Sequence, residues 1–257
     1  MTQALATFHL SHGPKNRPTL VFLPGALIPP NAIAPVTRIV KLRAIGVGWL
    51  EGAGPHDLHS VAARVAILLR ELGPTVLIGH SVGTPIAALA AAIDLRSTNS
   101  NAVGLVLSNS GANTKGHGDV ESIIERVLHT WGPPLWKAMT ERSLGSVCPA
   151  ELLDSFMTYP RRVTVEATVE SLRSLQQNDI TSMLSEVSSL PTAVVHGSRH
   201  PARTLSHAQS LSKGIQDSGL VVLETGHTSC VEAPDEFAKE IRAVVEQGLR
   251  AGTGSTD

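Results

Sequence analysis

The sequence predicts an α/β fold in which helices flank a mostly parallel β-sheet. Short runs rich in Val, Leu and Ile recur along the 257 residues, and segments of helical periodicity separate them. Between residues 111 and 190 the strand-like runs stop and helix-like segments take their place. The two patterns together predict an α/β core at residues 1–112 and 190–250 and a helical cap at residues 113–189. The small, polar residues 251–257 are expected to form a disordered tail.

Six runs are expected to form strands because each is short, apolar and rich in β-branched residues. In chain order they are residues 18–25, 38–46, 75–79, 102–110, 192–197 and 219–226. Helices are expected where apolar residues fall on one face, as in residues 58–69 and 237–249. Pro234 suits the first turn of the second of these helices, and Asp235 and Glu236 suit its positive dipole end. In the cap, the stretches "DVESIIERVLHTW", "PPLWKAMTERSL" and "PAELLDSFMTY" are expected to be helical.

The amino-acid composition indicates which classes of binding partner to expect. A chain with 42% hydrophobic residues, 17% charged residues and a net charge of -1 has the content of a globular core and no basic cluster. We therefore expect a small-molecule substrate, and neither nucleic acid nor a membrane as a partner. The first residues lack the pattern of a secretory signal, so a cytoplasmic protein is expected. Cys148 and Cys230 are too few for a disulfide framework and lack metal-site spacing, so reduced thiols and no metal site are expected.

The segment Gly79-His80-Ser81-Val82-Gly83 lies between a predicted strand and a predicted helix. A serine on such a sharp turn projects its oxygen away from the backbone, and flanking glycines leave room for the turn. A hydroxyl becomes a good nucleophile when a nearby base removes its proton. The pattern therefore predicts Ser81 as a nucleophile; the alternative is a glycine-rich turn with an idle serine. The base must approach from another loop, so His80 is interpreted as part of the turn.

The remaining machinery is expected from three other positions. The N–H of Val82 lies at the start of the helix, and Ala26 follows a glycine at the end of an earlier strand, so these two amides could hold an oxyanion. For Ala26 the alternative is a plain strand-ending turn. His227 follows a glycine at the end of the last strand and is the candidate general base.

With these motifs, the sequence resembles the α/β-hydrolase fold superfamily along nearly its whole length. The stretches "LVLSNSGANT", "HTWGPPLW", "NDITSMLSEVSSLPTAVVHG" and "GHTSCVEAPDEF" are most similar to the branch of 3-oxoadipate enol-lactonases, small esterases and haloperoxidase-like enzymes. The resemblance implies an eight-stranded, mostly parallel sheet and a helical cap between the sixth and seventh strands. It also implies that no metal or organic cofactor is used.

One position departs from the family. Where members commonly have the triad acid in a pattern like G-x-x-D-P, this chain has Gly197, Ser198, Arg199, His200 and Pro201. An imidazole at position 200 cannot supply the negative charge that stabilises a histidine cation.

Three explanations stay open for the missing acid. The third catalytic residue could be Asn109, from the end of the sixth strand, whose carbonyl could accept the Nδ1–H of His227. Glu224 or Asp119 could fold in to supply a carboxylate. Alternatively, the chemistry does not need a full triad.

The cap is expected to contribute the walls of the substrate pocket. Trp131 and Trp136 are the candidates there, with Trp49 from the core. A carboxylate-bearing substrate would need a cation, for which the candidates are Arg126, Lys137, Arg142, Arg161 and Arg162. The sequence as a whole predicts a serine hydrolase that cleaves a small carboxylic ester or lactone through an acyl-enzyme. The alternative is a non-hydrolytic catalyst or a ligand-binding protein on the same scaffold.

Overall fold

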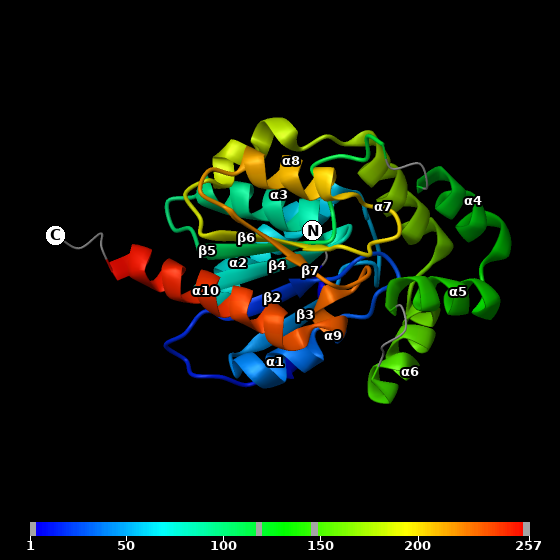
Figure 1. Cartoon of the computed structure of the whole chain (residues 1–257), viewed down its shortest axis with the longest axis horizontal. Coiled ribbons are helices and arrows are strands. Elements are labelled where there is room, and N and C mark those ends of the chain that lie inside the picture. Colours follow the sequence, from blue (N-terminus) through cyan, green and yellow to red (C-terminus); the bar gives the residue numbers. More distant parts are fainter. Residues whose placement is uncertain (1–3, 117–119, 145–148, 254–257) are drawn as a thin grey trace.

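The computed structural model describes residues 4–116, 120–144 and 149–253 (Figure 1). Its described part contains one seven-stranded sheet with the strand order β1-β3-β2-β4-β5-β6-β7. The strands are β1 (Ala6–Ser11), β2 (Thr19–Leu23), β3 (Ala44–Gly48), β4 (Thr75–His80), β5 (Ala102–Ser108), β6 (Thr192–Gly197) and β7 (Gly219–Leu223). Only β1 runs antiparallel to its neighbour; the other pairs are parallel. The predicted mostly parallel sheet is confirmed, with one strand fewer than the resemblance implies.

Two strand expectations differ from the structure at the start of the chain. The expected strand at residues 38–46 is wrong in its first part, because α1 (Ala34–Val40) takes residues 38–40. Pro35 lies in the first turn of α1, and Lys41 ends the helix in the left-handed region at φ 58°. The strand itself is β3, a few residues later. The edge strand β1 was not expected, since half-exposed residues weaken its apolar pattern.

Helices cover both faces of the sheet in Figure 1, with α3 and α8 on one side and α1, α9 and α10 on the other. The pleat divides β4 between these two layers. Leu77 packs with α2 and α3, whereas Val76 and Ile78 pack with α1 and α10. The bounds are α2 (Leu58–Leu72), α3 (Gly83–Leu95), α8 (Leu205–Gly214), α9 (Ser229–Glu232) and α10 (Pro234–Thr253). Because α10 continues through Thr253, it extends into the segment expected to be a tail.

The remaining helices lie between β5 and β6 in the chain and stand at one end of the sheet (Figure 1). They are α4 (Val120–Thr130), α5 (Pro133–Leu144), α6 (Ala150–Thr158) and α7 (Val165–Gln177), with the short 3₁₀ helices η1 (Tyr159–Arg162) and η2 (Thr181–Val187). The three cap stretches expected to be helical are confirmed by α4, α5 and α6. Helices α4 to α7 are called the cap below.

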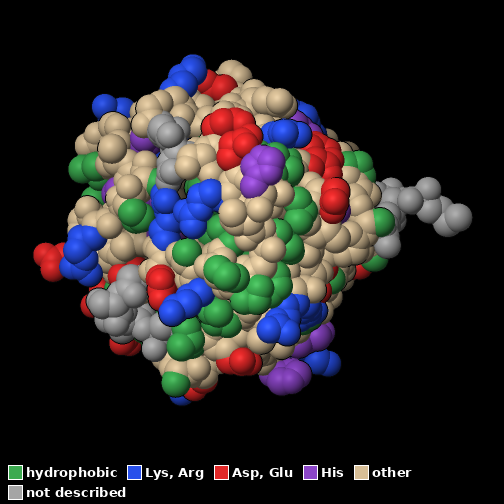
Figure 2. All heavy atoms as spheres, turned by 90° about the vertical axis from the view of Figure 1, so that its right-hand side faces the viewer, with side chains coloured by type: hydrophobic (Ala, Val, Ile, Leu, Met, Phe, Trp, Pro, Cys, Tyr) green, Lys and Arg blue, Asp and Glu red, His purple; other side chains and the backbone are tan. Residues whose placement is uncertain are grey.

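The surface on the cap side carries a mixed set of side chains (Figure 2). Basic and acidic side chains are scattered around a central group of apolar ones, so neither sign of charge forms a continuous field on this face. Within the described ranges, no helix has both the length and the apolar character that crossing a bilayer requires.

Candidate active site

Ser81 occupies the corner between β4 and α3. Its φ of 55° lies in the left-handed region, which is unfavourable by about 1–2 kcal/mol for a residue with a side chain. The corner is held by the Ser81 N–H, which donates to the carbonyl of Ser108 at 2.9 Å, and by the Thr84 N–H, which donates to the Ser81 carbonyl at 3.0 Å. A strained residue fixed by its surroundings is typical of functional sites.

The glycine at position 83 is required by a close approach. A Cβ placed on Gly83 would lie 1.9 Å from the backbone oxygen of Leu23, at the end of β2. The loop after β2 reaches the serine as well, since a Cβ on Gly25 would lie 2.8 Å from Ser81 Cβ and 3.2 Å from Ser81 Oγ. Small residues therefore bring the ends of β2 and β4 into contact around Ser81.

The two amides expected to hold an oxyanion lie beside this serine. Val82 caps the N-terminus of α3, and Ala26 follows Gly25 in the approaching loop. Both residues line one cavity together with Ser81. In the described part of the chain, neither amide N–H donates to a backbone carbonyl. Val82 and Ala26 therefore stay the candidate oxyanion donors beside Ser81.

His227 lies in the loop between β7 and α9 and lines the same cavity. The carboxylate of Glu232 holds this loop, since it accepts the Gly226 N–H at 2.8 Å and the Thr228 N–H at 3.3 Å. The Thr228 hydroxyl also donates to the Ser143 carbonyl of α5 at 2.6 Å, which ties the loop to the cap. Glu232 was not singled out from the sequence, because a carboxylate five residues after a histidine has no distinctive signal.

His200 contacts His227. The Nδ1 of His227 lies 2.6 Å from the Nε2 of His200, and the two ring planes are nearly perpendicular. The parallel strands β6 and β7 are neighbours, so the loops after their carboxyl ends meet. Backbone hydrogen bonds from Ser198 to the Leu223 carbonyl and from Arg199 to the Thr225 carbonyl join these loops. The position where the family has an acid therefore still contacts the histidine.

The expectation that Asn109 partners His227 is corrected by its hydrogen bonds. The Asn109 side chain accepts the Gly197 N–H at 2.8 Å and donates to the Ser229 hydroxyl at 2.8 Å. Its φ of 53° and its burial place the amide between β6 and α9, where it fixes the strand ends. The second alternative loses support as well, since the side chain of Glu224 is exposed. Asp119 lies outside the described residues.

His80 packs beside the candidate base His227. It is fully buried, its ring centroid lies 4.8 Å from that of His227, and its Nδ1 lies 3.1 Å from the Ser108 hydroxyl. Burial, with a smaller contribution from His200, lowers the pKa of His80 to about 3. His80 is therefore neutral near pH 7 and acts as a packed neighbour of His227.

The cavity at Ser81 has a volume of about 80 Å³, comparable to two or three water molecules. Its cap walls come from α4, α5 and α7, and the apolar ones are Val120, Ile123, Met139, Leu172 and Leu175. Trp131 and Trp136, the expected walls, are not among the residues that line this cavity; their rings pack edge to face on each other, with the centroids 5.8 Å apart. Trp49 is buried and donates to the Pro24 carbonyl. Tryptophans in this chain serve packing, as buried aromatics commonly do.

Among the described residues, two cations line the cavity. Arg142, from α5, is the one of the five expected cations that does so. Arg203 follows His200 and was not expected; it is 5% exposed and donates from Nη1 to the Asn113 carbonyl at 2.6 Å. Burial lowers the pKa of Arg203 to about 10, so it keeps its charge at neutral pH. The described residues give the Arg203 guanidinium no carboxylate partner.

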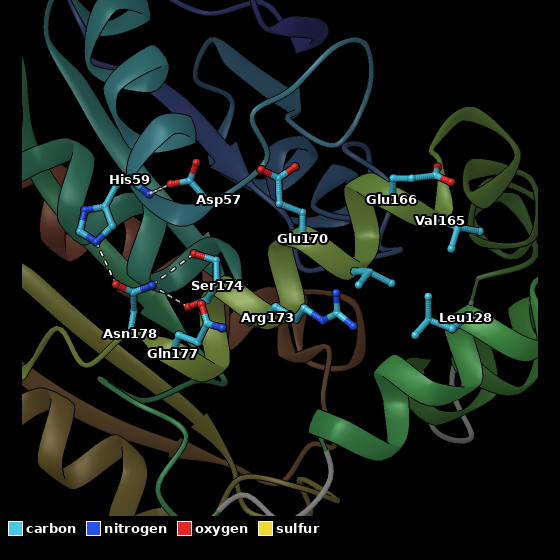
Figure 3. Close-up of a pocket in the computed structure, with 11 residues that line it drawn as sticks. Asp57, His59, Leu128, Val165, Glu166, Glu170, Arg173, Ser174, Gln177 and Asn178 are labelled. Carbon is cyan, nitrogen blue, oxygen red and sulfur yellow. Dashed lines mark hydrogen bonds between the residues drawn. The ribbon is translucent and has the colours of Figure 1, made fainter.

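A larger cavity of about 620 Å³ lies on the outer side of α7 (Figure 3). It is lined by α7 together with the start of α2 and Leu128 of α4. Asn178 bonds to His59 and to Ser174 there, and the carboxylate of Asp57 caps α2. These polar groups serve the local structure, and Ser81 and His227 lie elsewhere. Among the described residues, no cluster of His, Cys, Asp or Glu could hold a metal ion.

The fold and this serine-centred corner are those of an α/β hydrolase. The sequence pattern of the alpha/beta hydrolase family matches residues 20–240, and the chain belongs to that family. It is 31% identical over 84 residues to 3-oxoadipate enol-lactonase 2 of Acinetobacter baylyi. That match covers 33% of this chain and about a third, 31%, of the length of the relative.

Solved structures with the same fold include an esterase from Exiguobacterium antarcticum and an enol-lactonase from Burkholderia xenovorans LB400. The esterase has a TM-score of 0.78 and 20% identity, with 94% of this chain and 95% of the other covered. For the enol-lactonase the TM-score is 0.76, the identity is 15%, and the coverage is 94% and 96%. At these identities the likeness shows the fold. The chain thus has the fold of the α/β hydrolases along nearly its whole length.

Proposed function

We propose that the chain is a serine hydrolase that cleaves a small carboxylic ester or lactone through an acyl-enzyme. The observation that carries the proposal is the convergence of four groups on one cavity: Ser81 on its strained corner, the amides of Val82 and Ala26, and the imidazole of His227. Nucleophile, oxyanion donors and base are the parts that acyl transfer needs.

In the proposed reaction, Ser81 Oγ attacks the carbonyl carbon while its proton passes to Nε2 of His227. The amides of Val82 and Ala26 donate to the oxygen that becomes negative. The proton then moves from His227 to the leaving oxygen, the carbon–oxygen bond breaks and the acyl-enzyme remains. Water, deprotonated by His227, releases the acid and restores Ser81. For a lactone, the leaving oxygen stays tethered to the acyl group. No cofactor enters these steps.

Ser81 and His227 share the cavity. The hydrogen bond that carries the serine proton is expected to tighten when substrate binds. The small cavity supports a compact substrate, and the cations Arg142 and Arg203 in its wall support one that carries a carboxylate.

A second candidate is a non-hydrolytic catalyst or a ligand-binding protein on the same scaffold. One observation favours it: the residue against Nδ1 of His227 is an imidazole and not a carboxylate. An imidazole adds no negative charge to stabilise a histidine cation.

A panel of small esters and lactones, with and without a carboxylate, tests the proposal. Ser81→Ala and His227→Ala are expected to lower kcat/KM by 10²-fold or more while the thermal melt shows a folded protein. Ser171→Ala is the control, because its buried hydroxyl donates to the Thr168 carbonyl within α7. Turnover by Ser81→Ala at the wild-type rate on every substrate of the panel would overturn the proposal.

A further inference from the structure

We propose that His200 is a positioning residue that holds His227 in the tautomer with its proton on Nε2. In the resting protein, His227 then presents a proton donor to Ser81 instead of a proton acceptor. The inference rests on the proposed function, because it concerns how the same histidine serves Ser81. The wild-type chain is then expected to be a slow hydrolase, because the side chain of His200 limits its rate of hydrolysis.

The backbone beside His200 determines which of its ring nitrogens carries the proton. Its Nδ1 accepts two backbone hydrogen bonds, from the Ala202 N–H at 3.0 Å and from the Arg203 N–H at 2.8 Å. A ring nitrogen that accepts carries a lone pair and no proton. A neutral imidazole has one ring proton, so the proton of His200 is on Nε2.

The Nε2–H of His200 then determines the tautomer of His227. It points at Nδ1 of His227 across 2.6 Å, so that nitrogen must accept. Neutral His227 consequently carries its proton on Nε2. Since Nδ1 is used by His200, Nε2 is the nitrogen that must serve Ser81, and in this tautomer it has no lone pair with which to take the serine proton. The proposed reaction therefore proceeds through the less favoured tautomer of His227, in which the proton is on Nδ1.

The opposite arrangement is disfavoured at both rings. A proton on Nδ1 of His227 would require an accepting Nε2 on His200, and the His200 proton would then face the Ala202 and Arg203 N–H groups. Doubly protonated His227, which forms when the serine proton is taken, has the same conflict. A triad carboxylate has no such conflict, because it only accepts.

The expected size of the effect comes from a comparable change. Replacing the acid of a serine-protease triad by its amide leaves the geometry intact, gives the wrong histidine tautomer and lowers kcat about 10⁴-fold. In this chain the natural residue His200 imposes the same tautomer on His227. Without an accepting Nε2 on His227, the site still has the two oxyanion amides and the Nε2–H, and these donors can polarise a substrate carbonyl.

The direct test determines the tautomer of His227 by NMR and does not depend on an activity assay. In ¹⁵N-histidine-labelled protein at pH 7.5, long-range ¹H–¹⁵N correlation spectra distinguish a ring protonated on Nε2 from one protonated on Nδ1. His227→Gln and His200→Gln assign the signals. The inference expects both rings to be protonated on Nε2. A neutral His227 protonated on Nδ1 in the folded wild type would overturn it, whatever the enzyme turns out to catalyse.

The functional test substitutes a carboxylate for His200. Glu has its carboxylate oxygens as many bonds from the backbone as Nε2 of His200, and Gln is its neutral isostere. His200→Glu is expected to raise kcat for ester hydrolysis by about 10- to 10⁴-fold, with His200→Gln in between, and to move His227 to the Nδ1–H tautomer in the spectra. His200→Asp tests the family's own acid.

Folded carboxylate variants with kcat at or below that of the wild type would contradict the inference. If Ser81→Ala retains the activity, the proposed function fails instead, and the spectra still decide the tautomer.

Discussion

The loop that carries His227 depends on Glu232, and removing that carboxylate is expected to lower both stability and activity. The carboxylate accepts the N–H groups on either side of His227, at 2.8 and 3.3 Å. A hydrogen bond to a charged group contributes about 1.5–3 kcal/mol. Because Glu232 is half-buried and one bond is long, the loss in Glu232→Ala is about 2 kcal/mol. In a chain of this size, that corresponds to a fall in Tm of about 4–8 °C.

Activity should fall by about 10- to 100-fold in the same variant, since a shift of about 1 Å in a catalytic group has effects of this size. Urea unfolding and ester kinetics measure the two effects. Glu224→Ala is the matched control: it removes the same charge three residues before His227, from an exposed side chain. Glu232→Gln keeps one accepting oxygen and should lie between Ala and the wild type. Equal behaviour of Glu232→Ala and Glu224→Ala would refute the reasoning.

Three further predictions concern the corner, the cavity and acid stability. Gly83→Ala should abolish folding or lower Tm by more than 10 °C, because its methyl group would meet the Leu23 carbonyl; a melt at the wild-type temperature would contradict this. Arg203→Met should raise KM for carboxylate-bearing esters at least 10-fold relative to neutral ones, whereas Arg161→Met, above Trp136, should leave the ratio unchanged. His80, with its pKa lowered to about 3, should stabilise the protein above pH 6.5 and progressively less as the pH falls toward 3, so urea unfolding of His80→Gln should show a flatter pH dependence.

The features that the sequence predicts are those that depend on residues close together in the chain. The corner at Ser81 is specified by neighbours within the chain: an apolar strand, two glycines and a helix of small residues. The parallel strands β4 and β5 are mostly apolar and almost entirely buried, so their runs of apolar residues predicted them. By contrast, β1 shows the weaker pattern of a half-exposed edge. The end of α1 was expected to be a strand, because a short apolar run has the same pattern in a short helix and in a strand.

The contacts of the site depended on distant residues. His200 meets His227 because β6 and β7 are adjacent in the sheet, and no spacing in the sequence states that adjacency. Asn109 was the right kind of acceptor, but its two ends are used by Gly197 and Ser229. The cap tryptophans were chosen by residue type, whereas cavity walls depend on how α4, α5 and α7 pack. Residue chemistry predicts Ser81 as the candidate nucleophile, whereas tertiary packing determines which side chains lie around it.

The most direct measurement of the central claim is intact-mass labelling with a fluorophosphonate probe, which forms a bond only with an activated serine. The account predicts one adduct on the wild type, mapped to the peptide that contains Ser81. It predicts no adduct on Ser81→Ala and faster labelling of His200→Glu than of the wild type. A folded wild-type protein that stays unlabelled, or an adduct on another serine, would contradict the claim that Ser81 is the nucleophile.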